Sequence, residues 1–296
     1  MTRFRVWLQA ARPLTLTAAI VPVIVGAALA RAETGAWTTR WWVFGLVLLA
    51  AVLIQIGTNF VNDAKDFERG TDTGERLGPQ RVTQAGLLSG AAVMRGAWIA
   101  FALAIACGVP LVLAGGVPIL VIGLASVIAA YAYTGGPYPL GYHGFGEFFV
   151  ILFFGVIAVG GTYFLLAGVV SRAALVAGLA VGCLSSVLLA VNNLRDERGD
   201  RVSGKRTLVV RFGRSFGVAE IGVLSLLPFA LSVYWWNQGF PEAALLPLLA
   251  LPIAVGIVRR ASRNDGGALN GVLRLAAALH AIYGILFTLG AWMRAA

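Results

Sequence analysis

Residues 59–72 read NFVNDAKDFERGTD and follow a long apolar run at 41–57. The stretch contains four carboxylates and two carboxamides: Asn59, Asn62, Asp63, Asp66, Glu68 and Asp72. If it is helical, Asn62 and Asp66 share one face because they are four residues apart, and the same spacing pairs Asn59 with Asp63. Carboxylates this close repel one another unless a cation lies between them. Because Mg2+ prefers such oxygen ligands and commonly shares them with phosphate, the stretch predicts a magnesium site.

A second acidic stretch, 192–200, reads NNLRDERGD and also follows a long apolar run, 173–191. Asp196 and Asp200 are again four residues apart, and both stretches contain the string ERG. Acidic stretches at the ends of two apolar runs are typical of repeated halves that build one central site in a membrane protein. The alternative interpretation, two solvated loops with ordinary charges, does not explain why paired Asn and Asp recur at helical spacing.

The composition indicates a polytopic membrane protein. The chain has 296 residues, of which 59% are hydrophobic and 12% charged, and its mean hydropathy is +0.84. A soluble domain carries about 25% charged residues. The net charge of +10 is expected to set membrane topology and not to bind nucleic acid. Cys107 and Cys183 both lie in apolar runs, which predicts small packing residues and no disulfide or metal pair.

Nine segments are apolar over about the 20 residues that a helical span needs: 14–31, 41–60, 94–114, 117–134, 147–169, 173–192, 216–236, 241–258 and 272–293. A cytoplasmic N-terminus then leaves only four of the 23 lysines and arginines on the outer side: Arg31, Arg40, Arg172 and Arg294. Cytoplasmic segments are enriched in these residues, so the N-terminus is predicted inside and the C-terminus outside. Both acidic stretches, in inner loops at about 61–93 and 193–215, then face the cytoplasm.

Basic residues follow each acidic stretch. Arg76 and Arg81 come after the first, with Gln84 close by, and Arg195, Lys205, Arg206 and Arg211 lie in or after the second. Carboxylates beside cations suit a metal-bridged diphosphate, in which the metal holds some oxygens and Lys or Arg neutralises others. For any single one of these lysines or arginines, the alternative explanation is that it only sets the orientation of the chain in the membrane. Arg81, Arg195 and Lys205 are the best candidates, since they lie closest to the motifs.

The segment 135–146 reads GGPYPLGYHGFG, and its glycines and prolines exclude a regular helix. Irregular backbone beside a membrane core is tolerated where it packs on protein or lines a cavity, so this loop is expected to form a wall or lid. His143 is a candidate proton acceptor, although a single loop histidine is more often structural. His280, inside the last span, is expected to be a packing residue.

These residues carry a resemblance to the UbiA superfamily of intramembrane aromatic prenyltransferases. The first stretch is similar to the family motif NDxxDxxxD and the second to DxxxD, at Asn62, Asp63, Asp66 and Asp72 and at Asp196 and Asp200. One departure is that five residues, and not three, separate Asp66 from Asp72. Four strings resemble the branch that prenylates 1,4-dihydroxy-2-naphthoate in menaquinone synthesis: RPLTL (12–16), RLGPQRVTQAG (76–86), YTGGPYPLGYHGFGE (133–147) and NNLRDERGDRVSGKRTLVVRFG (192–213).

The resemblance implies an all-α bundle of about nine transmembrane helices, forming one domain over residues 1–296. It implies a central cavity open to the cytoplasm and laterally to lipid, in the inner membrane of a bacterium. The implied reaction transfers the prenyl group of an all-trans polyprenyl diphosphate to 1,4-dihydroxy-2-naphthoate, with Mg2+ as cofactor. The expected products are demethylmenaquinone, CO2 and diphosphate.

The expected site residues divide by role. The expected catalytic residues are Asn62, Asp66, Asp196, Asp200 and Lys205. The expected magnesium ligands are Asn62, Asp63, Asp66, Asp72, Asp196 and Asp200. Diphosphate is expected to contact Arg81, Arg195 and Lys205. The remaining substrate contacts are expected from Arg12, Asn59, Gln84, Tyr131, Tyr133, Tyr138, His143 and Asn193, with the tyrosines facing the allylic cation.

Two alternatives stay open at this point. Acidic pairs within a membrane also mark ion paths, so a cation-coupled transporter is a second class of function. Against it, the carboxylates are predicted at the ends of spans and not near the middle of the bilayer. Within the enzyme class, the acceptor ring could instead be 4-hydroxybenzoate or homogentisate.

Overall fold

The computed structural model describes residues 2–35, 40–70 and 77–294, which form helices and turns without a strand. The α-helices are α1 (Arg3–Ala11), α2 (Thr17–Thr34), α3 (Trp41–Glu68), α4 (Gly90–Ala132), α5 (Gly146–Ile151), α6 (Ala158–Ala167), α7 (Arg172–Val202), α8 (Leu208–Phe212), α9 (Arg214–Ala230), α10 (Ser232–Asn237), α11 (Pro241–Leu245), α12 (Leu251–Arg263) and α13 (Leu269–Arg294). A π-helical segment, Leu152–Ile157, joins α5 to α6. This confirms the all-α fold class, in which each helix satisfies its own backbone hydrogen bonds within lipid.

Eight helical stretches of the described residues are long and apolar enough to cross a membrane, and the longest, α4, is a hairpin. A straight helix of its 43 residues would be roughly 64 Å long, about twice the hydrocarbon thickness of a bilayer. Gly116 interrupts it with φ 68° and ψ −157°, a conformation open to glycine. The rings of Trp98 and Tyr131 stack at 5.3 Å across this break, so the two arms run antiparallel. The described residues therefore contain nine spans, as predicted.

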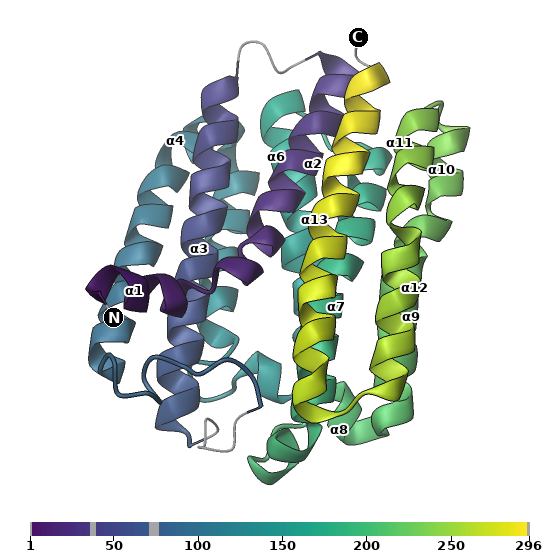
Figure 1. Cartoon of the computed structure of the whole chain (residues 1–296). Coiled ribbons are helices and arrows are strands. Elements are labelled where there is room, and N and C mark those ends of the chain that lie inside the picture. Colours follow the sequence, from purple (N-terminus) through teal and green to yellow (C-terminus); the bar gives the residue numbers. More distant parts are fainter. Residues whose placement is uncertain (1, 36–39, 71–76, 295–296) are drawn as a thin grey trace.

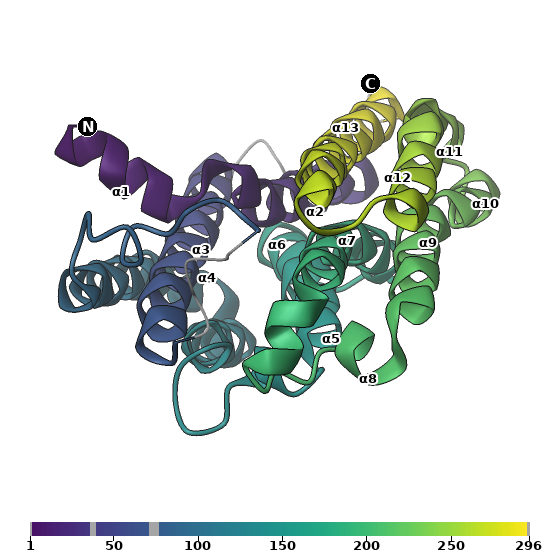
Figure 2. The same cartoon turned by 60° about the horizontal axis from the view of Figure 1, so that its bottom comes forward.

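Helix α7 lies at the centre of the bundle and packs against α2, α6, α9 and α13 (Figure 1 and Figure 2). The most apolar window of α7 is 78% buried, the largest share among the candidate spans. Glycines bring it close to the π-helical segment: a Cβ on Gly155 would lie 2.3 Å from the carbonyl oxygen of Gly178. Small residues at such contacts let helix backbones approach within lipid.

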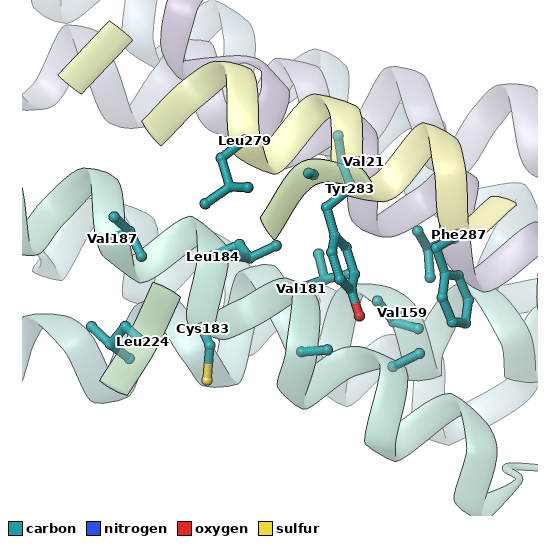
Figure 3. Close-up of a cluster of buried hydrophobic side chains, with 14 of the residues drawn as sticks. Val21, Val159, Val181, Cys183, Leu184, Val187, Leu224, Leu279, Tyr283 and Phe287 are labelled. Atoms are coloured by element: carbon teal, nitrogen blue, oxygen red, sulfur yellow. The ribbon is translucent and has the colours of Figure 1, made fainter. Parts of the chain in front are cut away.

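The main hydrophobic core joins α7 to the first and last spans. Figure 3 shows Leu184 of α7, Tyr283 of α13 and Val21 of α2 in one buried cluster. A Cβ on Gly284 would lie 2.3 Å from Cγ1 of Val21, so α2 and α13 also pack closely. Cys183 is a free, buried thiol in this core, as predicted for a packing residue.

Residues 59–68 of the first acidic stretch lie on α3 and the whole second stretch lies on α7, so the expected inner loops at 61–93 and 193–215 begin later than predicted. Helix α3 continues to Glu68 and α7 continues to Val202, so each span extends about three turns beyond its apolar run. The polar residues in these extensions include good helix formers such as lysine, glutamate and arginine, and helix formation there does not depend on lipid. Both extensions lie at the bottom of the bundle in Figure 1, at the opposite end from the C-terminus.

Candidate active site

A cavity of about 1360 Å3 extends from these helix ends into the bundle. Its polar lining includes eleven of the residues predicted for the site: Arg12, Asn59, Asn62, Asp66, Arg81, Tyr133, Asn193, Arg195, Asp196, Asp200 and Lys205. They come from the start of the chain, from α3, from the segment between α3 and α4, from the turn after α4, and from α7 and the turn after it. The structure thus brings two motifs more than a hundred residues apart to one cavity.

Asp66 is the most heavily engaged carboxylate of the cavity and only 3% exposed. Arg81 Nη2 lies 2.7 Å from its Oδ2, and the hydroxyl of Tyr142 donates to its Oδ1 at 2.7 Å. Lys205 Nζ lies 3.9 Å from the same Oδ1 and 3.6 Å from Oδ1 of Asp200. One ammonium group therefore lies between a carboxylate of α3 and a carboxylate of α7. This contact joins the two motifs directly.

Arg195 organises the other side of the polar end. Its Nε and Nη2 donate to the two oxygens of Asp196 at 2.8 and 2.6 Å. Its Nη1 donates to Oδ1 of Asn270 on α13 at 2.8 Å, and the Asn270 amide donates to the carbonyl oxygen of Leu77. Gly78 leaves room for the guanidinium, because a Cβ there would lie 2.7 Å from Nη2. Arg195 thus connects α7, α13 and the segment that leads to Arg81.

Asp63 holds the backbone of the segment that carries Arg81. The N–H groups of Val82 and Thr83 donate to its carboxylate at 3.2 and 3.1 Å, and the Thr83 hydroxyl donates to it as well. Asp63 is buried and does not line the cavity. The structure therefore places it behind Asp66, as an anchor for the turn at residues 81–86. Its predicted role as a magnesium ligand stays a prediction.

The loop at 135–146 forms part of the cavity wall, and it supplies a residue that the sequence analysis missed. Tyr142 donates to Asp66, and its ring lies 4.7 Å from Lys205 Nζ and 5.2 Å from the Arg69 guanidinium carbon. Just before the loop, the Thr134 hydroxyl donates to Asn62 Oδ1 at 2.6 Å. The sequence signal was present, since an irregular, tyrosine-containing loop beside a membrane core was expected to line a cavity. Nothing in it distinguished Tyr142 from its neighbours.

Besides Asp63, four predicted residues do not line the cavity: Gln84, Tyr131, Tyr138 and His143. Tyr138 is 55% exposed and stacks on the ring of His143 at 3.6 Å. The Nδ1 atom of His143 lies 2.9 Å from the carbonyl oxygen of Pro139, so this ring stabilises its own loop. Tyr131 stacks on Trp98 within the α4 hairpin. Asp72 and Arg76 lie outside the described residues.

Two asparagines support the cavity wall through hydrogen bonds. The amide of Asn59 donates to the carbonyl oxygen of Ala11 and to Oγ1 of Thr15, both at 2.9 Å. These contacts hold the junction at Arg12, whose φ of 52° is unusual for a residue with a side chain. The amide of Asn193 donates to Oε1 of Glu147 at 2.7 Å. Asn192 also lines the cavity, although the sequence pattern assigned it no role.

The donor set at the polar end fits Mg2+ bound together with a phosphate. Among the described residues, no three His, Cys, Asp or Glu side chains form a group that could hold a metal alone. Instead, Asp66 and Asp200 approach one cationic centre from different helices, and Asn62 and Asn192 line the same cavity. Mg2+ is typically held by one or two carboxylates and by the phosphates of a substrate, and not by an all-protein cage. The residues present therefore suit a metal that is shared with a phosphorylated ligand.

The rest of the cavity is mainly apolar. Phe149 and Phe153 stack in parallel, with ring centres 6.0 Å apart, and both line it. Aliphatic side chains of α2, α3, α4 and α7 complete the lining, among them Val23, Ile54 and Leu188. A ligand with a phosphorylated head and a long apolar tail matches this division between a charged end and an apolar interior.

Comparisons with known proteins agree on one family. The family model of the UbiA prenyltransferase family matches residues 19–292. A Mycobacterium tuberculosis protein described as 1,4-dihydroxy-2-naphthoate octaprenyltransferase is 37% identical, over 86% of this chain and 88% of its own length. An Escherichia coli protein with the same description is 34% identical, over 99% of this chain and 97% of its own length.

Solved structures show the same fold. A UbiA homologue from Aeropyrum pernix superimposes with a TM-score of 0.72 and 16% identity, covering 93% of this chain and 97% of that one. A UbiA homologue from Archaeoglobus fulgidus, bound to GPP and Mg2+, superimposes with a TM-score of 0.68 and 18% identity, covering 98% and 99%.

Proposed function

The chain belongs to the UbiA prenyltransferase family, and on that premise we propose that it prenylates 1,4-dihydroxy-2-naphthoate with a polyprenyl diphosphate in a Mg2+-dependent reaction. The convergence of both acidic motifs with Arg81 and Lys205 at the charged end of one apolar cavity carries this proposal. The relatives described as 1,4-dihydroxy-2-naphthoate octaprenyltransferases support the choice of acceptor.

The first step is the departure of diphosphate from the allylic carbon. Mg2+, when bound, would offset the negative charge that develops on the leaving group. Its proposed ligands are Asn62, Asp66, Asp196 and Asp200, together with Asp72, which lies outside the described residues. Arg81, Arg195 and Lys205 donate charge-assisted hydrogen bonds to the remaining diphosphate oxygens. Each of these cations already forms an ion pair with one of the proposed metal ligands. A diphosphate bound at those ligands is therefore close to all three cations without a large movement of the chain.

The second step joins the prenyl group to the ring. The electron-rich ring carbon that bears the carboxylate attacks the allylic carbon, and a carbon–carbon bond replaces the carbon–oxygen bond to diphosphate. Loss of the carboxylate as CO2 returns its electron pair to the ring and restores aromaticity. The apolar lining around Phe149 and Phe153 excludes water, which would otherwise capture the cation.

We place the site on the cytoplasmic side of a bacterial inner membrane. The distribution of lysine and arginine among the predicted loops supports this orientation, because it concentrates them at the end that carries both motifs. We treat residues 1–296 as one integral-membrane domain. Reporter fusions at either end of the chain test the orientation: we expect a cytoplasmic N-terminus and an external C-terminus, and the reverse result would contradict it.

One assay tests the proposed reaction. The purified protein in lipid nanodiscs receives Mg2+, an isotope-labelled polyprenyl diphosphate and a panel of aromatic acids that includes 4-hydroxybenzoate and homogentisate. We expect a prenylated, decarboxylated product from 1,4-dihydroxy-2-naphthoate, identified by its mass, and none after exhaustive chelation by EDTA. If only another ring is prenylated, that ring and not 1,4-dihydroxy-2-naphthoate is the acceptor. The absence of product from every ring would contradict the proposed function.

A further inference from the structure

One polar side chain lies deep in the cavity without a role in the steps above. Gln55 of α3 lines the cavity, is only 7% exposed, and its Oε1 has no hydrogen-bond partner among the described residues. It lies eleven residues before Asp66 on the same helix, which corresponds to about 16 Å along the axis. A buried oxygen without a donor is costly, so this position favours a ligand that carries an O–H or N–H group.

A second polar group lies at a comparable depth on α7. Ser185 lines the cavity eleven residues before Asp196, and its Oγ lies 3.1 Å from Nε2 of His280 on α13. His280 is fully buried, and its Nδ1 has no partner among the described residues. A buried N–H group without an acceptor is less tolerable than a buried nitrogen lone pair without a donor. Because Nδ1 has no partner among the described residues, the favoured tautomer of His280 has its proton on Nε2. In that form His280 donates to Ser185, and the serine hydroxyl is left to donate into the cavity.

An aromatic wall lies at the same level as Ser185. A Cβ on Gly146 would lie 2.9 Å from Cδ2 of Leu189, and a Cβ on Gly182 would lie 2.7 Å from the carbonyl oxygen of Ile151. Both contacts join α5 to α7. Ser185 lies between Gly182 and Leu189 on α7, so its neighbour on α5 is the turn that contains Phe149. This ring, stacked with that of Phe153, gives a flat apolar surface at the level of Ser185.

We propose that Gln55 and Ser185, the latter oriented by His280, bind the oxygen atoms of the acceptor ring while Phe149 and Phe153 line its apolar side. The proposal rests on the proposed function. Gln55 Oε1 accepts from the ring hydroxyl remote from the carboxylate, and Ser185 donates to a ring oxygen. The prenyl tail cannot satisfy either group because it has no polar atom. A ring that attacks the first prenyl carbon lies on the membrane side of the diphosphate, where these residues are.

Binding of two naphthoates tests this assignment. The full chain in lipid nanodiscs is titrated anaerobically with 1,4-dihydroxy-2-naphthoate and with 1-hydroxy-2-naphthoate, which lacks only the remote hydroxyl. We expect the wild type to prefer the dihydroxy ring by about tenfold, the usual effect of pairing one buried polar group. Gln55→Met, which keeps the length of the side chain, should reduce this preference to about one.

Thr58→Val is the matched control. Thr58 lines the same cavity from the same helix, but its hydroxyl already donates to the carbonyl oxygen of Ile54 at 2.8 Å. We expect this variant to keep the tenfold preference. Gln55→Leu repeats the test if the methionine variant does not fold. Ser185→Ala tests the serine separately. We expect this variant to bind both naphthoates more weakly and to keep its affinity for geranyl diphosphate.

Three results would overturn the assignment: no preference in the wild type, a preference that persists in Gln55→Met, or an equal loss in Thr58→Val. Prenyl transfer by the wild type is measured in the same nanodiscs. If the wild type forms product but Gln55→Met keeps its preference, only the acceptor assignment fails. If no ring is prenylated, the proposed function fails and the assignment fails with it.

Discussion

At the scale of single residues, the chemistry depends on how Asp66 is held. Its two oxygens contact an arginine, a lysine and a tyrosine from three different segments: Arg81, Lys205 and Tyr142. Such contacts fix the carboxylate in one orientation and keep it ionised in a site with little access to water. A preorganised carboxylate of this kind can bind a metal without rearranging its neighbours.

Asp66→Ala is expected to lower the rate of prenyl transfer by roughly 10²–10³-fold, the usual effect of removing one electrostatic group from an active site. The protein should remain inserted in the membrane, because α3 keeps its apolar run. Glu68→Ala is the matched control, since Glu68 is an exposed carboxylate of the same helix that pairs only with Lys65 among the ion pairs described. Normal transfer by the Asp66 variant, or an equal loss in the Glu68 variant, would contradict the role of Asp66.

Tyr142→Phe tests the residue that the sequence analysis missed. The change removes the hydroxyl that donates to Asp66 and keeps the ring beside Lys205. We expect kcat to fall by about tenfold, because a hydrogen bond to a charged group is worth roughly 1.5–3 kcal/mol. Tyr138→Phe should have little effect, since Tyr138 is exposed and outside the cavity. A larger loss of kcat in Tyr138→Phe than in Tyr142→Phe would contradict this account, and would favour Tyr138, the residue predicted from the sequence, as the functional tyrosine.

At the scale of elements, α3 uses neighbouring residues for different tasks. Asp66 faces the cavity, whereas Asp63 binds the turn at 81–86 that carries Arg81. A spacing pattern assigns both carboxylates to the metal because it shows which residues are close along a helix. It does not show which segment, distant in the chain, packs on each face. The ends of α3 and α7 are predicted as loops for another reason: a span is recognised by its apolar residues, whereas the helix continues into the polar residues that follow.

Asp63→Ala separates these two roles. Its loss leaves the N–H groups of Val82 and Thr83 without an acceptor, at a cost of about 1–3 kcal/mol each. We expect faster hydrogen exchange at residues 81–86 and an unchanged Mg2+ concentration for half-maximal activity. A shift in the Mg2+ requirement with unchanged exchange would instead identify Asp63 as a metal ligand.

At the scale of the whole molecule, the spans and their number could be predicted because a bilayer demands about 20 apolar residues per helix. The recurrence of an acidic stretch after two apolar runs predicted that the two motifs share one site. The structure brings them to one cavity, where Lys205 contacts both. Sequence could not locate Gln55 or Ser185 in the site. A single polar residue in an apolar run is equally consistent with helix packing, and only the structure shows which polar residues line the cavity.

The central claim is that the motifs of α3 and α7 act as one site. The most direct measurement is a double-mutant cycle on Mg2+-dependent binding of geranyl diphosphate, with Asp66→Asn, Asp200→Asn and the double variant in nanodiscs. If both carboxylates serve one metal-bridged diphosphate, the double variant should bind about as weakly as the weaker single variant, since residues that act as a unit are strongly non-additive. Losses that simply add would contradict the claim.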